Sequence, residues 1–206
     1  MAQSTRIVAP WLLGLLLSVA ASAQDNDSLP AARIFEALAL KSGATVCEVG
    51  AGHGELTLAA AERVGRQGHV YTSELGDERV RTLRTKVMAP DRPQVQVVAG
   101  AAYHTNFPEA ACDALFMRNV YHHFAAPGPM GSSLAASLKP GGRIAVVDFT
   151  PPGAEAPTPA DRDEDNMHGV TPESVRRELA DAGFHVEKTE TGSGRWFMVV
   201  AVRPGS

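Results

Sequence analysis

The residues with the most specific chemical meaning form a glycine-rich turn and an acidic position that follows it. The turn is VCEVGAGHGEL, and its glycines are Gly50, Gly52 and Gly54. Glycines between a buried strand and a helix let the backbone turn sharply and approach a bound ligand closely. Glu74 follows Gly50 by 24 residues, close to the spacing of roughly 20 at which an acidic residue hydrogen-bonds ribose hydroxyls. Together these residues predict a nucleotide-like ligand.

The turn departs from the dinucleotide fingerprint. That fingerprint, G-x-G-x-x-G/A, needs a third small residue where this chain has Glu55. The pattern here is acidic-x-G-x-G-x-G and begins at Glu48. The difference disfavours a nicotinamide-dependent oxidoreductase.

Titratable side chains follow two later predicted strands. His122 and His123 come just after one strand, and Asp148 ends the next. The ordinary pKa of a histidine side chain is about 6.5, and this value suits a general base. We expect the two histidines to point in different directions, so that at most one is catalytic, while a structural or solvated role is the alternative for each. His53, inside the glycine turn, is expected to line the ligand.

The elements that position these residues alternate between strand and helix. Predicted strands are Thr45–Val49, His69–Ser73, Gln94–Val98, Ala114–Arg118 and Arg143–Phe149, and predicted helices are Ala31–Leu40, Glu55–Val64, Asp77–Met88 and Met130–Leu138. This alternation predicts a parallel sheet with helices on both faces. A helix from Thr171 to Ala182 and a Gly-rich hairpin of strands Phe184–Thr189 and Trp196–Val202 complete the chain. The predicted fold is α/β: a Rossmann-like seven-stranded sheet with five parallel strands and a C-terminal antiparallel hairpin.

The segment 150–170 matches no helix or strand pattern. It leaves the carboxyl end of a strand, where open α/β sheets bind ligands. A substrate lid and a solvated loop are therefore both possible interpretations of this segment. Its acids Asp161, Asp163, Glu164 and Asp165 suit a cationic acceptor or a solvated face. No local metal-ligand spacing such as H-x-x-x-H occurs, so we expect no metal.

Taken in order, the motifs resemble those of class I S-adenosylmethionine (SAM)-dependent methyltransferases of the type 11 and type 25 kind. VCEVGAGHG resembles their first motif, YTSEL the second, DALFMRNVYHHF the fourth, and LKPGGRIAVVDF the segment around the fifth strand. The resemblance spans Ile34 to Val202. NVYHHF is most similar to small-molecule methyltransferases of the quinone-biosynthesis type. The implied function is methyl transfer from SAM to an unidentified, small-molecule acceptor.

The resemblance also implies a role for each motif residue. Gly50, Gly52 and Gly54 would pass under the methionine moiety, Glu48 would organise their loop, Glu74 would hold the ribose, Leu75 would pack on the adenine and Asn119 would face the reacting methyl group. Ala101 stands where the family usually places an acidic residue near the adenine amino group. One hydrogen bond worth about 1 kcal/mol would be missing there.

The first 23 residues are predicted to be an export signal, separate from one methyltransferase domain at 24–206. Arg6 precedes an apolar run from Ile7 to Val19, and Ala21-Ser22-Ala23 is a small-x-small cleavage pattern. The run is shorter than the ~20 residues that a spanning helix needs. We therefore expect a periplasmic or secreted protein without stable membrane insertion after cleavage. An uncleaved anchor, or a misassigned start and a cytoplasmic protein, are the alternatives.

Charge and cysteine content add three expectations. The formal net charge of −4 disfavours nucleic-acid partners, because phosphate binding needs a basic surface. Cys47 and Cys112 are expected on neighbouring strands at different heights, and so as free thiols. The alternative function is an exported, degenerate Rossmann-like binding module without methyltransferase activity. Two features motivate it: the export signal, because SAM is made in the cytoplasm, and Ala101, because it removes a hydrogen bond to the adenine.

Overall fold

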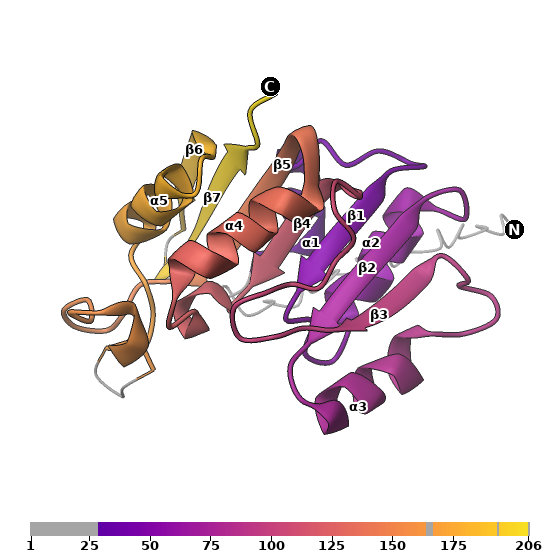
Figure 1. The fold of residues 1–206 in the computed structure, drawn as a ribbon, viewed down its shortest axis with the longest axis horizontal. Coiled ribbons are helices and arrows are strands. Elements are labelled where there is room, and N and C mark those ends of the chain that lie inside the picture. The colour runs from indigo at the N-terminus through magenta and orange to yellow at the C-terminus, as the bar shows by residue number, and fades with distance from the viewer. Residues whose placement is uncertain (1–28, 164–166, 193, 206) are drawn as a thin grey trace, which may run out of the picture.

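The computed structural model describes residues 29–163, 167–192 and 194–205, and within them a seven-stranded mixed sheet (Figure 1). The proposed export signal lies outside these residues. The strands are β1 (Thr45–Val49), β2 (His69–Glu74), β3 (Val95–Ala99), β4 (Cys112–Arg118), β5 (Leu138–Phe149), β6 (His185–Thr191) and β7 (Trp196–Val202). Their order is β3-β2-β1-β4-β5-β7-β6, and only the pairings of β7 with β5 and β6 are antiparallel. The predicted fold class is confirmed.

Helices cover both faces of the sheet and divide the core into two clusters. They are α1 (Ala31–Ala37), α2 (Glu55–Val64), α3 (Asp77–Val87), α4 (Pro127–Ser137) and α5 (Pro172–Asp181), with short 3-10 helices η1 (Tyr121–His123) and η2 (Pro159–Asp161). One cluster packs Ile34, Val64 and Leu83 of α1 to α3 on the sheet, and the other packs Leu134 of α4 and Leu179 of α5. The central parallel strands are buried on both faces, which explains their nearly continuous apolar sequences.

The site depends on a reversal of chain direction across the sheet. From β1 the chain adds β2 and β3 on one side, and it then returns to place β4 on the other side of β1. The connections that follow β1 and β4 therefore leave the same sheet edge in different directions. A crevice forms at such a switch point, at the carboxyl ends of the strands.

The long segment after β5 is packed against α5 where it is described. Arg162, whose exposed fraction is 2%, donates to both carboxylate oxygens of Glu178 in α5, at 3.2 and 2.5 Å. Thr171 caps α5 by accepting a hydrogen bond from Ser174 N at 3.2 Å. The same hydroxyl donates to Glu155 at 2.7 Å. Buried ion pairing and capping thus hold the middle and the C-terminal end of this segment in place.

None of the helices in the described residues is both long and apolar enough to cross a membrane.

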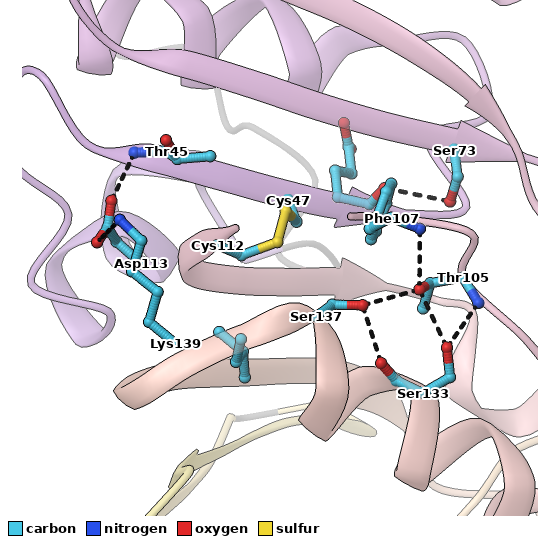
Figure 2. The surroundings of a disulfide bond; sticks show 12 residues. Thr45, Cys47, Ser73, Thr105, Phe107, Cys112, Asp113, Ser133, Ser137 and Lys139 are labelled. Atoms are coloured by element: carbon cyan, nitrogen blue, oxygen red, sulfur yellow. Dashed lines mark hydrogen bonds and ion pairs between the residues drawn. A yellow bond between two sulfur atoms is a disulfide. The ribbon is translucent and has the colours of Figure 1, made fainter. Parts of the chain in front are cut away.

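The expectation of two free thiols is wrong, because Cys47 and Cys112 form a disulfide (Figure 2). Their Cα atoms are 5.8 Å apart, within the range that a disulfide bridges. The predicted difference in height assumed regular strands. Instead, the register of β4 with β5 shifts between Cys112 and Ala114, the regular pairing of β4 with β1 begins only at Ala114, and Cys112 joins the core cluster that contains Cys47. The bond ties β1 to β4 next to the chain reversal.

Reduction of this disulfide is expected to lower the free energy of unfolding by about 4 kcal/mol, because the bond closes a loop with a sequence separation of 65 residues. Urea unfolding with and without dithiothreitol measures the change. The double variant Cys47→Ala/Cys112→Ala is the control and should not respond to the reductant. Two thiols titrated in the denatured, unreduced protein would contradict the prediction.

Candidate functional site

A cavity of about 650 Å³ opens at the carboxyl ends of β1, β2 and β4. Its volume lies within the range of roughly 300–1,000 Å³ typical of small-molecule sites. The glycine turn after β1, the end of β2, the segment 100–105 after β3 and the segment 118–125 after β4 form most of its wall. These are the connections that the chain reversal brings to one edge.

The glycine turn is folded in a way that side chains would prevent at two positions. Gly50 has a φ of +69°, and a Cβ there would lie 2.5 Å from a side-chain carbon of Val120. At Gly54, with a φ of +83°, a Cβ would lie 2.3 Å from Val87 of α3. A Cβ at Gly52 would meet no atom within 4 Å. Glycine is therefore required for close packing at the first two positions, while Gly52 presents bare backbone to open space.

Glu74 joins the glycine turn to the end of β2. One carboxylate oxygen accepts a hydrogen bond from Gly52 N at 2.8 Å, and the other accepts from Leu75 N at 2.9 Å. The guanidinium of Arg79 lies 3.6 Å from the second oxygen. An ionised carboxylate has about four acceptor positions. Two backbone bonds orient the group and leave further positions for hydroxyl donors in the cavity.

Glu48 has a different environment from Glu74. Its exposed fraction is 3%, and one carboxylate oxygen accepts hydrogen bonds from the hydroxyls of Thr57 in α2 and Thr72 in β2. Burial raises the pKa of Glu48 to about 7, and the two hydroxyls only partly offset this effect. The carboxyl group ties β1, β2 and α2 together beneath the turn, which agrees with the organising role expected for it.

Asn119 follows β4 in a strained conformation. Its φ is +56°, in the left-handed region that asparagine tolerates better than most residues, and its backbone N–H donates to Val147 O at 2.9 Å. Val120, next in the chain, packs over Gly50. Such strain is common at functional sites. The segment after β4 is thereby held against the glycine turn.

The two histidines after β4 lie in a group of rings beside the cavity, and His123 lines it. His122 is buried, with its Nδ1 2.8 Å from Asp148 Oδ1, and its backbone N–H also donates to Asp148 Oδ2 at 3.2 Å. The ring centroids of His122 and His123 are 4.0 Å apart. His123 is exposed, with its Nδ1 2.6 Å from Asp163 Oδ1. His168 lies on the other side, with its Nε2 3.1 Å from His122 Nε2.

Most of the site residues expected from the sequence meet at this cavity. Those that line it are Glu48, Gly50, Gly52, His53, Glu74, Leu75, Ala101, Asn119 and His123. Gly54, His122 and Asp148 do not line it. Gly54 packs on α3, and His122 with Asp148 forms a buried pair behind His123.

Several wall residues had no signal in the sequence. Tyr103, exposed at 54%, and Thr105 come from the segment after β3, next to Ala101. Ala101 forms an isolated bridge with His104. Asp163 reaches the wall from a remote part of the chain. Its position in an acidic run was the only hint, and that run indicates a solvated face equally well.

Comparisons with known proteins point to one family. A model of the methyltransferase domain family matches residues 46–142. The ubiquinone/menaquinone biosynthesis C-methyltransferase UbiE of Methylococcus capsulatus is 32% identical over 118 residues, which cover 54% of this chain and 45% of that protein. The match thus spans less than half of that relative. These findings support the resemblance of this chain to class I methyltransferases.

Solved structures extend the likeness to most of the chain. A SAM-dependent methyltransferase from Aquifex aeolicus has a TM-score of 0.71 and 25% identity, over 84% of this chain and 89% of that one. The [4+2]-cyclase SpnF has a TM-score of 0.75 with 16% identity, over 89% of this chain and 86% of that one. The second likeness concerns the fold alone.

Stability is expected to fall as the pH rises from about 5 to about 7, because of Glu48. Its pKa of about 7 in the folded protein exceeds the ordinary value of 4.5, so in this window the folded state keeps a proton that the unfolded state releases. The contribution of this group is a loss of about 3 kcal/mol across the window. Unfolding titrations at several pH values should show a flatter profile for Glu48→Gln than for the wild type.

The control for this experiment is Glu62→Gln, which removes an exposed carboxylate from the same helix that carries Thr57. Its pH profile should parallel that of the wild type. Parallel profiles for Glu48→Gln and the wild type would contradict the assignment.

Proposed function

We propose that this chain is a SAM-dependent methyltransferase that acts on a small-molecule acceptor. The observation that carries the proposal is the placement of Glu74. Its carboxylate is oriented by the N–H groups of Gly52 and Leu75 at the wall of a cavity on the sheet's switch point. An acidic group held in this way is suited to the two hydroxyls of a ribose. The family match at 46–142 includes this residue and the glycine turn.

The residues present fit the cofactor along its length. Gly52 offers backbone without a side chain in open space, which suits close approach of the methionine moiety. Glu74 holds the ribose. Leu75, exposed at 41%, offers an apolar surface to the adenine. Ala101 leaves one hydrogen bond to the adenine amino group unmade, a loss of about 1 kcal/mol that is small beside the other contacts.

The acceptor end of the cavity lies beyond Asn119. When bound, SAM would supply an electrophilic methyl group on its sulfonium sulfur. The protein's share is to orient the two reactants and to exclude water. His123 and Asp163 line this part of the wall, and Asp148 orients His122 behind them. A proton carried by the acceptor would leave to this group of residues.

Support for a small acceptor comes from size, charge and relatives. A cavity of about 650 Å³ that also holds the cofactor has room for a small molecule. The chain's net charge of −4 is unfavourable for nucleic acid. The relative named for ubiquinone and menaquinone biosynthesis acts on small molecules of that class.

We further propose that the protein is exported and that its signal is removed after Ala23. The pattern of residues 1–23 motivates this, and the disulfide between Cys47 and Cys112 supports it. Disulfides persist in oxidising compartments and are rare where thiols are kept reduced.

Calorimetric titration of the purified protein with SAM and with S-adenosylhomocysteine is expected to show saturable binding. Glu74→Gln should weaken it by about tenfold to a hundredfold, because hydrogen bonds to a charged group contribute roughly 1.5–3 kcal/mol. Glu78→Gln removes an exposed carboxylate four residues further along, outside the cavity, and should change the affinity less than twofold.

Absence of SAM binding by a protein that unfolds cooperatively would refute the proposal and would favour the degenerate binding module. Binding of NAD in place of SAM would instead favour the oxidoreductase reading.

The export proposal is tested separately, by the location of the protein and by its N-terminal residue. In a bacterial host with a periplasm, the full-length chain is expected outside the cytoplasm with Gln24 as its first residue. Cell fractionation followed by N-terminal sequencing measures both features. An intact N-terminus in the cytoplasmic fraction, with both cysteines accessible to a thiol reagent, would refute the export proposal and leave the methyltransferase proposal standing.

A further inference from the structure

Four side chains with metal-binding atoms converge beside the cavity, and two of them, His123 and Asp163, line it. They are His122 and His123 of η1, with Asp163 and His168 of the segment after β5, and one ligand atom from each lies within 4.8 Å of all the others. We propose that this cluster, the histidine cluster, binds a divalent transition-metal ion of the zinc type. The inference concerns metal binding by the chain and holds whether or not the chain transfers methyl groups.

His122 is prepared as a ligand by Asp148. The carboxylate of Asp148 is fully buried and accepts hydrogen bonds from the backbone N–H groups of His122 and Phe149, at 3.2 and 2.9 Å. An ionised carboxylate only accepts, so its contact of 2.8 Å with His122 Nδ1 places a proton on that nitrogen. In the neutral ring, Nε2 then carries a lone pair. Carboxylate–histidine pairs of this kind orient the ligands of many metal sites.

That lone pair points toward the rest of the cluster. His168 Nε2 lies 3.1 Å from His122 Nε2, and Asp163 Oδ1 lies 2.6 Å from His123 Nδ1. Ligand atoms about 2.0–2.1 Å from a tetrahedral zinc ion are roughly 3.3 Å apart. The separations in the histidine cluster, from 2.6 Å to 4.8 Å, bracket this value. Movements of the ligand atoms on the order of 1 Å would bring these separations to the spacing around a zinc ion.

The cluster is both supported and accessible. The ring of Phe149 packs against His122 and His168, with centroids 4.7 and 5.2 Å away. Arg162, next to Asp163, is held by its pair with Glu178, and its carbonyl accepts from the N–H of Gly169, next to His168. His123, Asp163 and His168 are exposed, so an ion has a route to the cluster.

The chemistry of the donors selects the class of ion. Three imidazoles and one carboxylate suit zinc, copper or nickel, whereas magnesium and calcium prefer oxygen ligands. The earlier expectation of no metal rested on the absence of local spacing, but these ligands come from two distant parts of the chain. The proposal also gives His122 a role other than proton acceptance, because its free lone pair would bind the ion.

The test is calorimetric titration of the chelator-treated, full-length protein with zinc chloride and, separately, with magnesium chloride. The expected result is one zinc ion per chain and no saturable magnesium binding. His168→Ala removes an exposed ligand and should weaken zinc binding at least tenfold. Asp148→Asn tests the positioning of His122 and should cost 10- to 100-fold, roughly. Circular dichroism confirms that each variant is folded.

His185→Ala is the matched control, because it removes an exposed histidine from β6, outside the cluster. Its zinc affinity should equal that of the wild type. Equal affinities for His168→Ala and His185→Ala, or no zinc binding by the folded wild type, would overturn the proposal. Titration with SAM in the same samples separates this outcome from failure of the proposed function.

Discussion

Parallel pairing of β1 with β4 is the constraint on which the rest of the site depends. The two strands are adjacent in the sheet but separated in the sequence by α2, β2, α3 and β3. Their carboxyl ends therefore deliver two unrelated connections to one place, the glycine turn and the segment that begins at Asn119. The contact of Val120 with Gly50 closes the gap between them, and it exists only because glycine has no side chain there. The disulfide joins the same two strands covalently.

Two acidic residues near the turn show how burial separates their roles. Glu48 lies inside the protein, where desolvation raises its pKa to about 7 and its hydroxyl partners come from α2 and β2. Glu74 lies at the cavity wall, and its partners are two backbone N–H groups. Glu48 therefore connects the elements beneath the site, and its contribution to the free energy of unfolding falls as the pH rises. The second presents an oriented acceptor to a ligand.

The far end of the cavity depends on a different interaction. The buried pair of Arg162 and Glu178 fixes the segment after β5 against α5. That attachment brings Asp163 and His168 to the histidines after β4. An element without regular secondary structure thus contributes to the wall as specifically as the strands do. The fold alone does not dictate the chemistry performed there, since a cyclase shares it.

Local patterns in the sequence were sufficient to predict the sheet, with its parallel strands and antiparallel hairpin, and the cofactor end of the site. The spacing of apolar residues follows directly from which side chains are buried. Glycines followed by an acidic residue at a set spacing indicate a backbone geometry that few other residues allow. The predicted helix from Met130 begins earlier, at Pro127, and β5 begins at Leu138 rather than Arg143. Only the tertiary structure decided the disulfide and the histidine cluster. The first depends on the irregular pairing at the start of β4, and the second depends on the buried ion pair of Arg162 with Glu178. Both arise from packing between residues far apart in the chain, Cys47 with Cys112 in the first case, and His122 and His123 with Asp163 and His168 in the second.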